Sequence, residues 1–116
     1  MQVVFLGTGD AFGSGGRNAS SMLVCSGNQR FLLDCGPCTL PAMKAAGLKP
    51  ADINAILLSH LHGDHFGGIP FFFLEYQFLS PRDDELLIAG PPGTQQRVED
   101  LYGVMFSEMK DVPRKF

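Results

Sequence analysis

The strongest constraint on the fold is the alternation of short apolar segments with segments of helical periodicity. The last such segment places Val98, Leu101, Tyr102, Met105 and Phe106 on one face of a helix. Strands are predicted at residues 1–6, 21–25, 30–34, 55–58 and 86–89, and helices at residues 41–46, 69–79 and the segment that carries this face. Strands that alternate with helices in this way favour an α/β layered fold.

Composition narrows the class of protein further. A chain of 116 residues with 45% apolar residues can build one domain with a real core. The longest apolar run, residues 69–74, is far shorter than the roughly 20 residues that cross a bilayer, so we expect neither membrane insertion nor export. The net charge of −3 gives no global attraction to nucleic acid, and three cysteines without a signal peptide suit a reducing cytoplasm.

Two glycine-rich stretches have part of the pattern of nucleotide-binding loops. The first stretch, Gly7-Thr8-Gly9-Asp10-Ala11-Phe12-Gly13, follows a strand, and Asp34 ends a later strand as a ribose ligand would. Its third glycine, Gly13, comes one position later than the dinucleotide-binding fingerprint requires. Glycines at 13, 15 and 16 also disfavour the helix that would face a pyrophosphate. Gly90-Pro91-Pro92-Gly93-Thr94 lacks the second glycine and the lysine of a P-loop, and we interpret it as a turn that starts a helix.

Cys35-Gly36-Pro37-Cys38 is identical to the active-site tetrapeptide of thioredoxin, and it lies between a predicted strand and a predicted helix. Against a redox role, Asp34 stands where thioredoxin has tryptophan, and a carboxylate beside the attacking thiol raises its pKa. Pro41 is predicted to start the helix, which leaves Cys38 in the preceding loop. Two incidental thiols are the favoured interpretation.

All three histidines of the chain lie within Ser59-His60-Leu61-His62-Gly63-Asp64-His65, directly after the apolar strand at 55–58. In an extended loop, residues two apart point the same way, so His60 and His62 can present two imidazoles to one metal ion. Gly63 allows a turn that directs Asp64 and His65 to a neighbouring position. Nitrogen and carboxylate ligands without cysteine suit Zn²⁺, with Mn²⁺ or Fe as substitutes.

The segment His60-Leu61-His62-Gly63-Asp64-His65 resembles the HxHxDH signature of the metallo-β-lactamase superfamily. Other segments resemble, in order, the N-terminal half of its tRNase Z-like branch: Phe5-Leu6-Gly7-Thr8-Gly9, Arg17-Asn18-Ala19-Ser20-Ser21, Leu32-Leu33-Asp34-Cys35-Gly36, Gly67-Gly68-Ile69-Pro70 and Leu87-Ile88-Ala89-Gly90-Pro91. The resemblance covers almost the whole chain. It implies an α/β fold that is half of a four-layer αββα sandwich.

The resemblance also implies a chemistry. His60 and His62 would bind one metal ion, and Asp64 and His65 a second, so that two Zn²⁺ ions occupy the complete domain. A metal-bound hydroxide would attack a phosphodiester, or a carbonyl in other branches. Asp64 would be the catalytic residue that handles the proton of the nucleophile, and Asp34 would support the loop from behind the ligands.

The sequence departs from this family in one respect, because no histidine follows His65. Asp100 and Asp111 fall in an expected helix and tail, where neither matches the bridging aspartate of the family. We therefore expect residues 1–116 to be the N-terminal portion of a single metallo-β-lactamase-fold domain, with residues 110–116 as a flexible tail. An exposed apolar sheet face would then favour a homo-oligomer or association with the missing C-terminal half.

The leading functional hypothesis is a metal-dependent hydrolase, of the phosphodiesterase or tRNA 3′-processing endoribonuclease type, that is incomplete and inactive as this fragment. Its substrate would be a phosphodiester or another small hydrolysable molecule, with RNA as one option. Two alternatives remain open at this point: a thiol-disulfide oxidoreductase that uses Cys35 and Cys38, and a non-catalytic interaction module that keeps only the fold.

Overall fold

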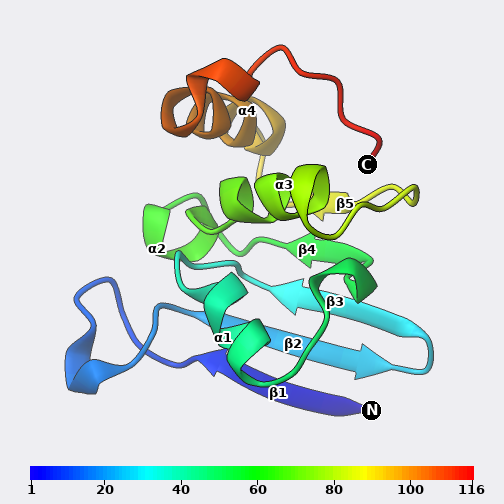
Figure 1. The fold of residues 1–116 in the computed structure, drawn as a ribbon. Helices are drawn as coiled ribbons and strands as arrows, with labels where there is room; N and C mark the ends of the chain where they lie inside the picture. Colours follow the sequence, from blue (N-terminus) through cyan, green and yellow to red (C-terminus); the bar gives the residue numbers. More distant parts are fainter.

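A five-stranded mixed sheet organises the chain, and the computed structural model describes all of residues 1–116 (Figure 1). The strands are β1 (Gln2–Gly7), β2 (Ser21–Ser26), β3 (Gln29–Leu33), β4 (Ala55–Leu57) and β5 (Leu87–Ala89). The helices are α1 (Thr39–Ala45), α2 (Gly63–Phe66), α3 (Ile69–Phe78) and α4 (Thr94–Met105), with short 3₁₀ turns η1 (Ser14–Gly16), η2 (Pro50–Asp52) and η3 (Ser107–Met109). The α/β fold class predicted from the sequence is confirmed.

The strands lie in chain order across the sheet, and the pairing changes direction at β3. β1, β2 and β3 pair antiparallel. β2 and β3 form a hairpin, and its turn uses Gly27 at a φ of 57°. β3, β4 and β5 pair parallel, because a crossover that contains a helix separates each from the next. The carboxyl ends of β3 and β4 therefore meet at one edge of the sheet.

The predicted helix at 41–46 begins two residues earlier than expected, at Thr39. Proline is tolerated throughout the first turn of a helix, where its missing N–H would have no partner, so Pro41 did not have to be the first helical residue. Cys38 consequently precedes the helix directly as its N-cap residue. The single turn α2 was not predicted at all, because four residues are too few to show a helical period.

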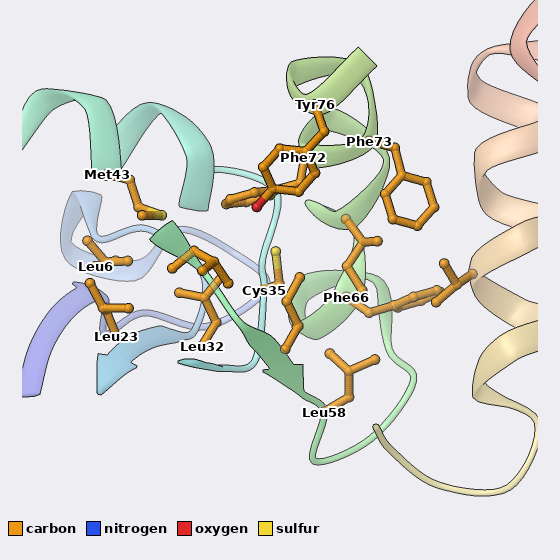
Figure 2. Packing of buried hydrophobic residues seen from close by; sticks show 14 of the residues in the cluster. Leu6, Leu23, Leu32, Cys35, Met43, Leu58, Phe66, Phe72, Phe73 and Tyr76 are labelled. Atoms are coloured by element: carbon orange, nitrogen blue, oxygen red, sulfur yellow. The ribbon is translucent and has the colours of Figure 1, made fainter. Parts of the chain in front are cut away.

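One face of the sheet carries the core. Leu23, Leu32 and Ile56 point into a cluster with Met43 of α1 and Phe72 of α3, and all five are at most 1% exposed (Figure 2). Helices α1 and α3 lie on the same side of the sheet (Figure 1). Burial of such side chains contributes roughly 1.5–3 kcal/mol each, so this face anchors the fold.

The opposite face of the sheet is also apolar, but no helix covers it. Because side chains alternate along a strand, the neighbours of the core residues point to this second face. Its residues are Val3, Phe5, Met22, Val24, Phe31, Leu33, Ala55, Leu57, Leu87 and Ala89. Phe5 and Leu87 are 65% and 60% exposed, respectively. We call these ten residues the open face.

The C-terminal residues lie against α3 and α4. Arg114 pairs with Glu99 of α4, and the Phe116 ring packs 5.5 Å from that of Phe73 and 5.2 Å from that of Tyr76. The flexibility predicted for residues 110–116 stays a prediction beside these contacts. None of the helices has the length and apolar character that spanning a bilayer requires.

Candidate metal centre

The three histidines lie just beyond the carboxyl end of β4. The strand ladder continues through Leu58, whose N–H donates to Ala89 O at 2.8 Å, and the chain then leaves the sheet. It bends at Ser59, is extended at His62, where φ is −81° and ψ is 149°, and turns into α2 at Gly63. The turn predicted at Gly63 is a single helical turn.

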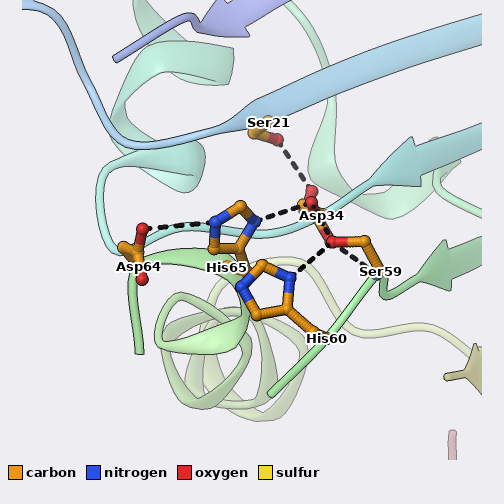
Figure 3. A network of polar contacts seen from close by, with 6 residues as sticks. All are labelled: Ser21, Asp34, Ser59, His60, Asp64 and His65. Carbon is orange, nitrogen blue, oxygen red and sulfur yellow. Dashed lines mark hydrogen bonds and ion pairs between the residues drawn. The ribbon is translucent and has the colours of Figure 1, made fainter. Parts of the chain in front are cut away.

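The three histidine rings lie close together, and Figure 3 shows two of them, His60 and His65. The ring centroid of His60 lies 4.7 Å from that of His62 and 4.0 Å from that of His65. Asp64 Oδ2 lies 3.2 Å from His65 Nε2. The four residues that the sequence analysis singled out therefore form one cluster.

Asp34, at the end of β3, supports this cluster through hydrogen bonds to Ser59 and His65 (Figure 3). Its carboxylate accepts hydrogen bonds from the Ser59 N–H at 2.8 Å, from Ser59 Oγ and from His65 Nδ1 at 2.8 Å. Burial opposes ionisation, but these hydrogen bonds outweigh it and hold the pKa of the Asp34 carboxyl below its usual value. The supporting position that the resemblance implied for Asp34 agrees with these contacts.

The backbone of Asp34 is unusual, because its φ of 59° is in the left-handed region that favours glycine. Two hydrogen bonds hold this conformation: the Asp34 N–H donates to Leu57 O at 2.8 Å, and Ser21 Oγ donates to Asp34 O at 3.0 Å. A strained residue kept in place by buried contacts is typical of functional sites.

The tetrapeptide that begins at Cys35 supports the histidine loop through its backbone. The Cys35 N–H donates to His65 O at 2.7 Å, and Cys35 O accepts from the Gly68 N–H at 2.9 Å. A Cβ on Gly36 would lie 2.7 Å from Asp64 O, so only glycine allows this approach. The thioredoxin-like sequence thus has a structural explanation.

The thiols themselves are poorly suited to redox catalysis. Cys35 is fully buried, and burial, with a smaller contribution from the nearby Asp34 carboxylate, raises the pKa of its thiol to about 12. Cys38 is exposed and the two cysteines are not bonded. A nucleophilic cysteine needs an accessible thiolate, so the geometry does not favour the oxidoreductase alternative.

The first glycine stretch serves packing instead of nucleotide binding. A Cβ on Gly7 would meet Ala19 O at 1.9 Å, which shows that the loop before β2 lies directly on the end of β1. Only the short turn η1 follows, so no helix N-terminus faces this loop. Gly93, in the second stretch, precedes α4 as the predicted turn.

The clustered histidines and Asp64 fit metal ions that each take two side chains from this chain. His65 Nδ1 is hydrogen-bonded to Asp34. His65 Nε2 therefore lies beside Asp64 Oδ2, and the two atoms form a nitrogen–oxygen pair. His60 and His62 supply two adjacent imidazoles. No three His, Cys, Asp or Glu side chains are placed to share one ion. This chain therefore offers two side chains per ion, one fewer than a catalytic zinc ordinarily takes from protein.

A cavity also lies away from the histidines. It has a volume of about 480 Å³ and is formed by β5, α4 and the C-terminal residues, including Leu87, Val98 and Phe116. None of the histidines lines it. Since the cluster of three histidines and Asp64 is at the end of β4, we place the candidate site there and not in this cavity.

Solved structures with the same fold place the chain in a class. The short form of human tRNase Z matches 90% of this chain with a TM-score of 0.80 and 33% identity, and the match covers 40% of that chain. The Bacillus subtilis protein YhfI, described as a metallo-beta-lactamase fold protein, matches 81% of this chain and 39% of its own, with a TM-score of 0.66 and 28% identity. Zn²⁺-bound PqqB from Methylobacterium extorquens, at 21% identity and a TM-score of 0.66, shares the fold. The chain carries the N-terminal part of a metallo-β-lactamase fold, in the tRNase Z-like branch.

Sequence relatives agree with this class. Ribonuclease Z of Methanothermobacter thermautotrophicus is 41% identical over 96 residues, which are 83% of this chain and 31% of that protein. Ribonuclease Z of Oceanobacillus iheyensis is 39% identical over 85% of this chain and 33% of its own length. The chain thus spans about a third of the curated relatives it matches. The sequence profile of the family described as Anti-Pycsar protein Apyc1 matches residues 1–111, and the chain belongs to that family.

Two residues of the site were given no role by the sequence analysis. Ser59 joins Asp34 to the histidine loop, and Ser21 fixes the backbone of Asp34. A signal for Ser59 was available, because it follows directly after the predicted strand at 55–58. No signal could have identified Ser21, since its partner is a backbone carbonyl 13 residues away.

Proposed function

We propose that this chain is the metal-binding N-terminal portion of a metal-dependent hydrolase that cleaves phosphodiesters. The observation that supports it most is the convergence of His60, His62, His65 and Asp64 at the end of β4. RNA 3′-processing is the more specific proposal, based on the relatives named ribonuclease Z. The three free cysteines support a reducing cytoplasm as its compartment.

Each residue has a defined part in this proposal. His60 and His62 hold one ion, and Asp64 and His65 hold the second, with Zn²⁺ as the favoured metal. When bound, the metal supplies a water of lowered pKa and positive charge to stabilise the transition state. Asp64 accepts the proton of the attacking water, and Asp34 keeps the His65 ring in place.

The remaining ligands would come from outside these 116 residues. No histidine follows His65, and two side chains per ion are available from this chain. Residues 1–116 therefore form one portion of the catalytic domain in this proposal. Either the rest of the sandwich or a second copy of the chain would cover the open face.

Metal binding tests the proposal on the chain itself. Zinc titration by calorimetry should give saturable binding, and Asp64→Ala should remove the binding of one ion. Asp100→Ala is a matched control, because Asp100 is an exposed aspartate of α4 whose side chain accepts a hydrogen bond from Gln96. Absence of zinc binding by the wild-type chain would support the non-catalytic interaction module instead.

Catalysis is tested with the natural protein that contains this chain. Hydrolysis of bis-p-nitrophenyl phosphate should fall by about 100-fold or more in Asp64→Ala, because a residue that transfers the nucleophile's proton contributes that much. Asp100→Ala should leave the rate unchanged. Full activity in Asp64→Ala would remove Asp64 from the catalytic role.

A further inference from the structure

We propose that Ser59 is a positioning residue which, together with Asp34, fixes the proton of the His60 ring on Nδ1 and so keeps Nε2 free to bind metal. This inference rests on the proposed function, because it assigns Ser59 a purpose in the same metal centre. It adds a residue outside the four proposed ligands.

The hydroxyl of Ser59 lies between two partners (Figure 3). Ser59 Oγ is 2.8 Å from Asp34 Oδ2 and 3.0 Å from Asp34 Oδ1, and it is 3.0 Å from His60 Nδ1. The Ser59 N–H also donates to Asp34 Oδ1 at 2.8 Å. The serine is therefore held by both its backbone and its side chain.

Counting protons gives the direction of these hydrogen bonds. A hydroxyl has one proton, and an ionised carboxylate can only accept, so the Ser59 O–H donates to Asp34. The Ser59 oxygen then has only lone pairs to offer, and His60 Nδ1 must carry the hydrogen that it donates to them. His60 Nε2 is left with its lone pair.

The same carboxylate acts directly on His65. Asp34 Oδ2 accepts from His65 Nδ1 at 2.8 Å, which leaves His65 Nε2 on the side of Asp64. One carboxylate thus sets the tautomer of a proposed ligand of each ion, directly for His65 and through Ser59 for His60. A hydrogen bond to the second ring nitrogen is the usual way in which proteins orient metal-binding histidines.

Strand pairing brings the two partners together. Leu33 of β3 is paired with Leu57 of β4, and the Asp34 N–H donates to Leu57 O. Ser59 follows Leu57 by two residues, so it lies at the end of β4 opposite the end of β3 that carries Asp34. The position of Ser59 is therefore a consequence of the sheet register.

The tautomers can be measured without metal. Two-bond ¹H–¹⁵N correlation spectra of the histidine-labelled chain, recorded at about pH 8, distinguish a ring protonated on Nδ1 from one protonated on Nε2. In the wild-type chain His60 should carry its proton on Nδ1. In Ser59→Ala the proton should move toward Nε2, and Ser59→Thr, which keeps the hydroxyl, should restore the wild-type spectrum.

Two controls and one functional measurement complete the test. Ser107→Ala removes an exposed serine of η3 and should leave the His60 signals unchanged. Zinc affinity should fall by about 10- to 100-fold in Ser59→Ala and recover in Ser59→Thr. Circular dichroism with the wild-type thermal midpoint would exclude unfolding as the cause.

The proposal fails if wild-type His60 carries its proton on Nε2, or if Ser59→Ala leaves the tautomer unchanged. This outcome is separate from the failure of the proposed function. A wild-type chain that binds no zinc, but whose His60 tautomer depends on Ser59, would contradict the hydrolase proposal and leave the role of Ser59 as a tautomer-setting residue intact.

Discussion

The two faces of the sheet are made by the same five strands, yet their surroundings differ. On one face, Leu32 is completely buried beneath helices. On the other, the next residue of the same strand, Leu33, belongs to an apolar surface that no helix covers. Both faces are therefore apolar in sequence, and only one of them is packed within this chain.

The difference shows what an apolar strand does and does not predict. A strand that is apolar on both sides is typical of a sheet covered on both faces. Here the second cover is not part of residues 1–116, and the matched relatives are about three times as long as the match. We infer that the open face is an interface toward the second layer of a sandwich.

The largest expected effect compares two neighbouring leucines. Leu32→Ala should lower the free energy of unfolding by about 2–5 kcal/mol, because it leaves a cavity in a packed core. Leu33→Ala should cost less, about 1–2 kcal/mol, because Leu33 is only partly buried and no helix packs over its face of the sheet. Urea denaturation of both variants, at two protein concentrations, measures the difference. Equal losses would mean that the open face is covered in solution.

A second comparison uses a buried cysteine, Cys35, and an exposed one, Cys38. Burial raises the pKa of Cys35 from 9.0 to about 12. Between these pH values the native state keeps a proton that the unfolded state has lost, so the free energy of unfolding should fall as pH rises. The slope from this one group is about 1.4 kcal/mol per pH unit.

Unfolding curves between pH 8 and 12 check this expectation. The Cys35 contribution should be fully present below pH 9 and should be lost as the pH approaches 12. Cys35→Ala should flatten the slope, whereas Cys38→Ala, which removes an exposed thiol, should not. A steep slope that survives in Cys35→Ala would show that another group is responsible.

The sequence predicted most of the fold, because strands and long helices leave periodic patterns. The hairpin, the strand at β4 and the helix α3 fall within one residue of the predicted positions. The single turn α2 was not predicted, and the start of α1 was predicted two residues late. A local sequence pattern cannot identify a helix of four residues or fix one position within a first turn.

Some features of the candidate site could likewise be predicted from the sequence, and others could not. The clustering of His60, His62 and His65 followed from their spacing and from the strand before them. The left-handed backbone of Asp34 and the bridging hydroxyl of Ser59 did not, because both depend on the register between β3 and β4. Contacts between strands that are distant in sequence cannot be inferred from either strand alone.

The smallest expected effect on stability, and the sharpest test of the open face, comes from a charge placed on it. Phe5→Lys should change the free energy of unfolding by no more than about 0.5 kcal/mol, because Phe5 is 65% exposed. It should nevertheless reduce any self-association of the chain, since a lysine on an apolar face opposes its burial against another apolar surface. Phe12→Lys is the matched control, because Phe12 is 91% exposed in a loop outside the open face. Sedimentation velocity of the three proteins over a range of concentrations decides the matter. If the wild type associates and only Phe5→Lys is monomeric, the open face is the interface; if Phe12→Lys has the same effect, or Phe5→Lys has none, the association surface is elsewhere.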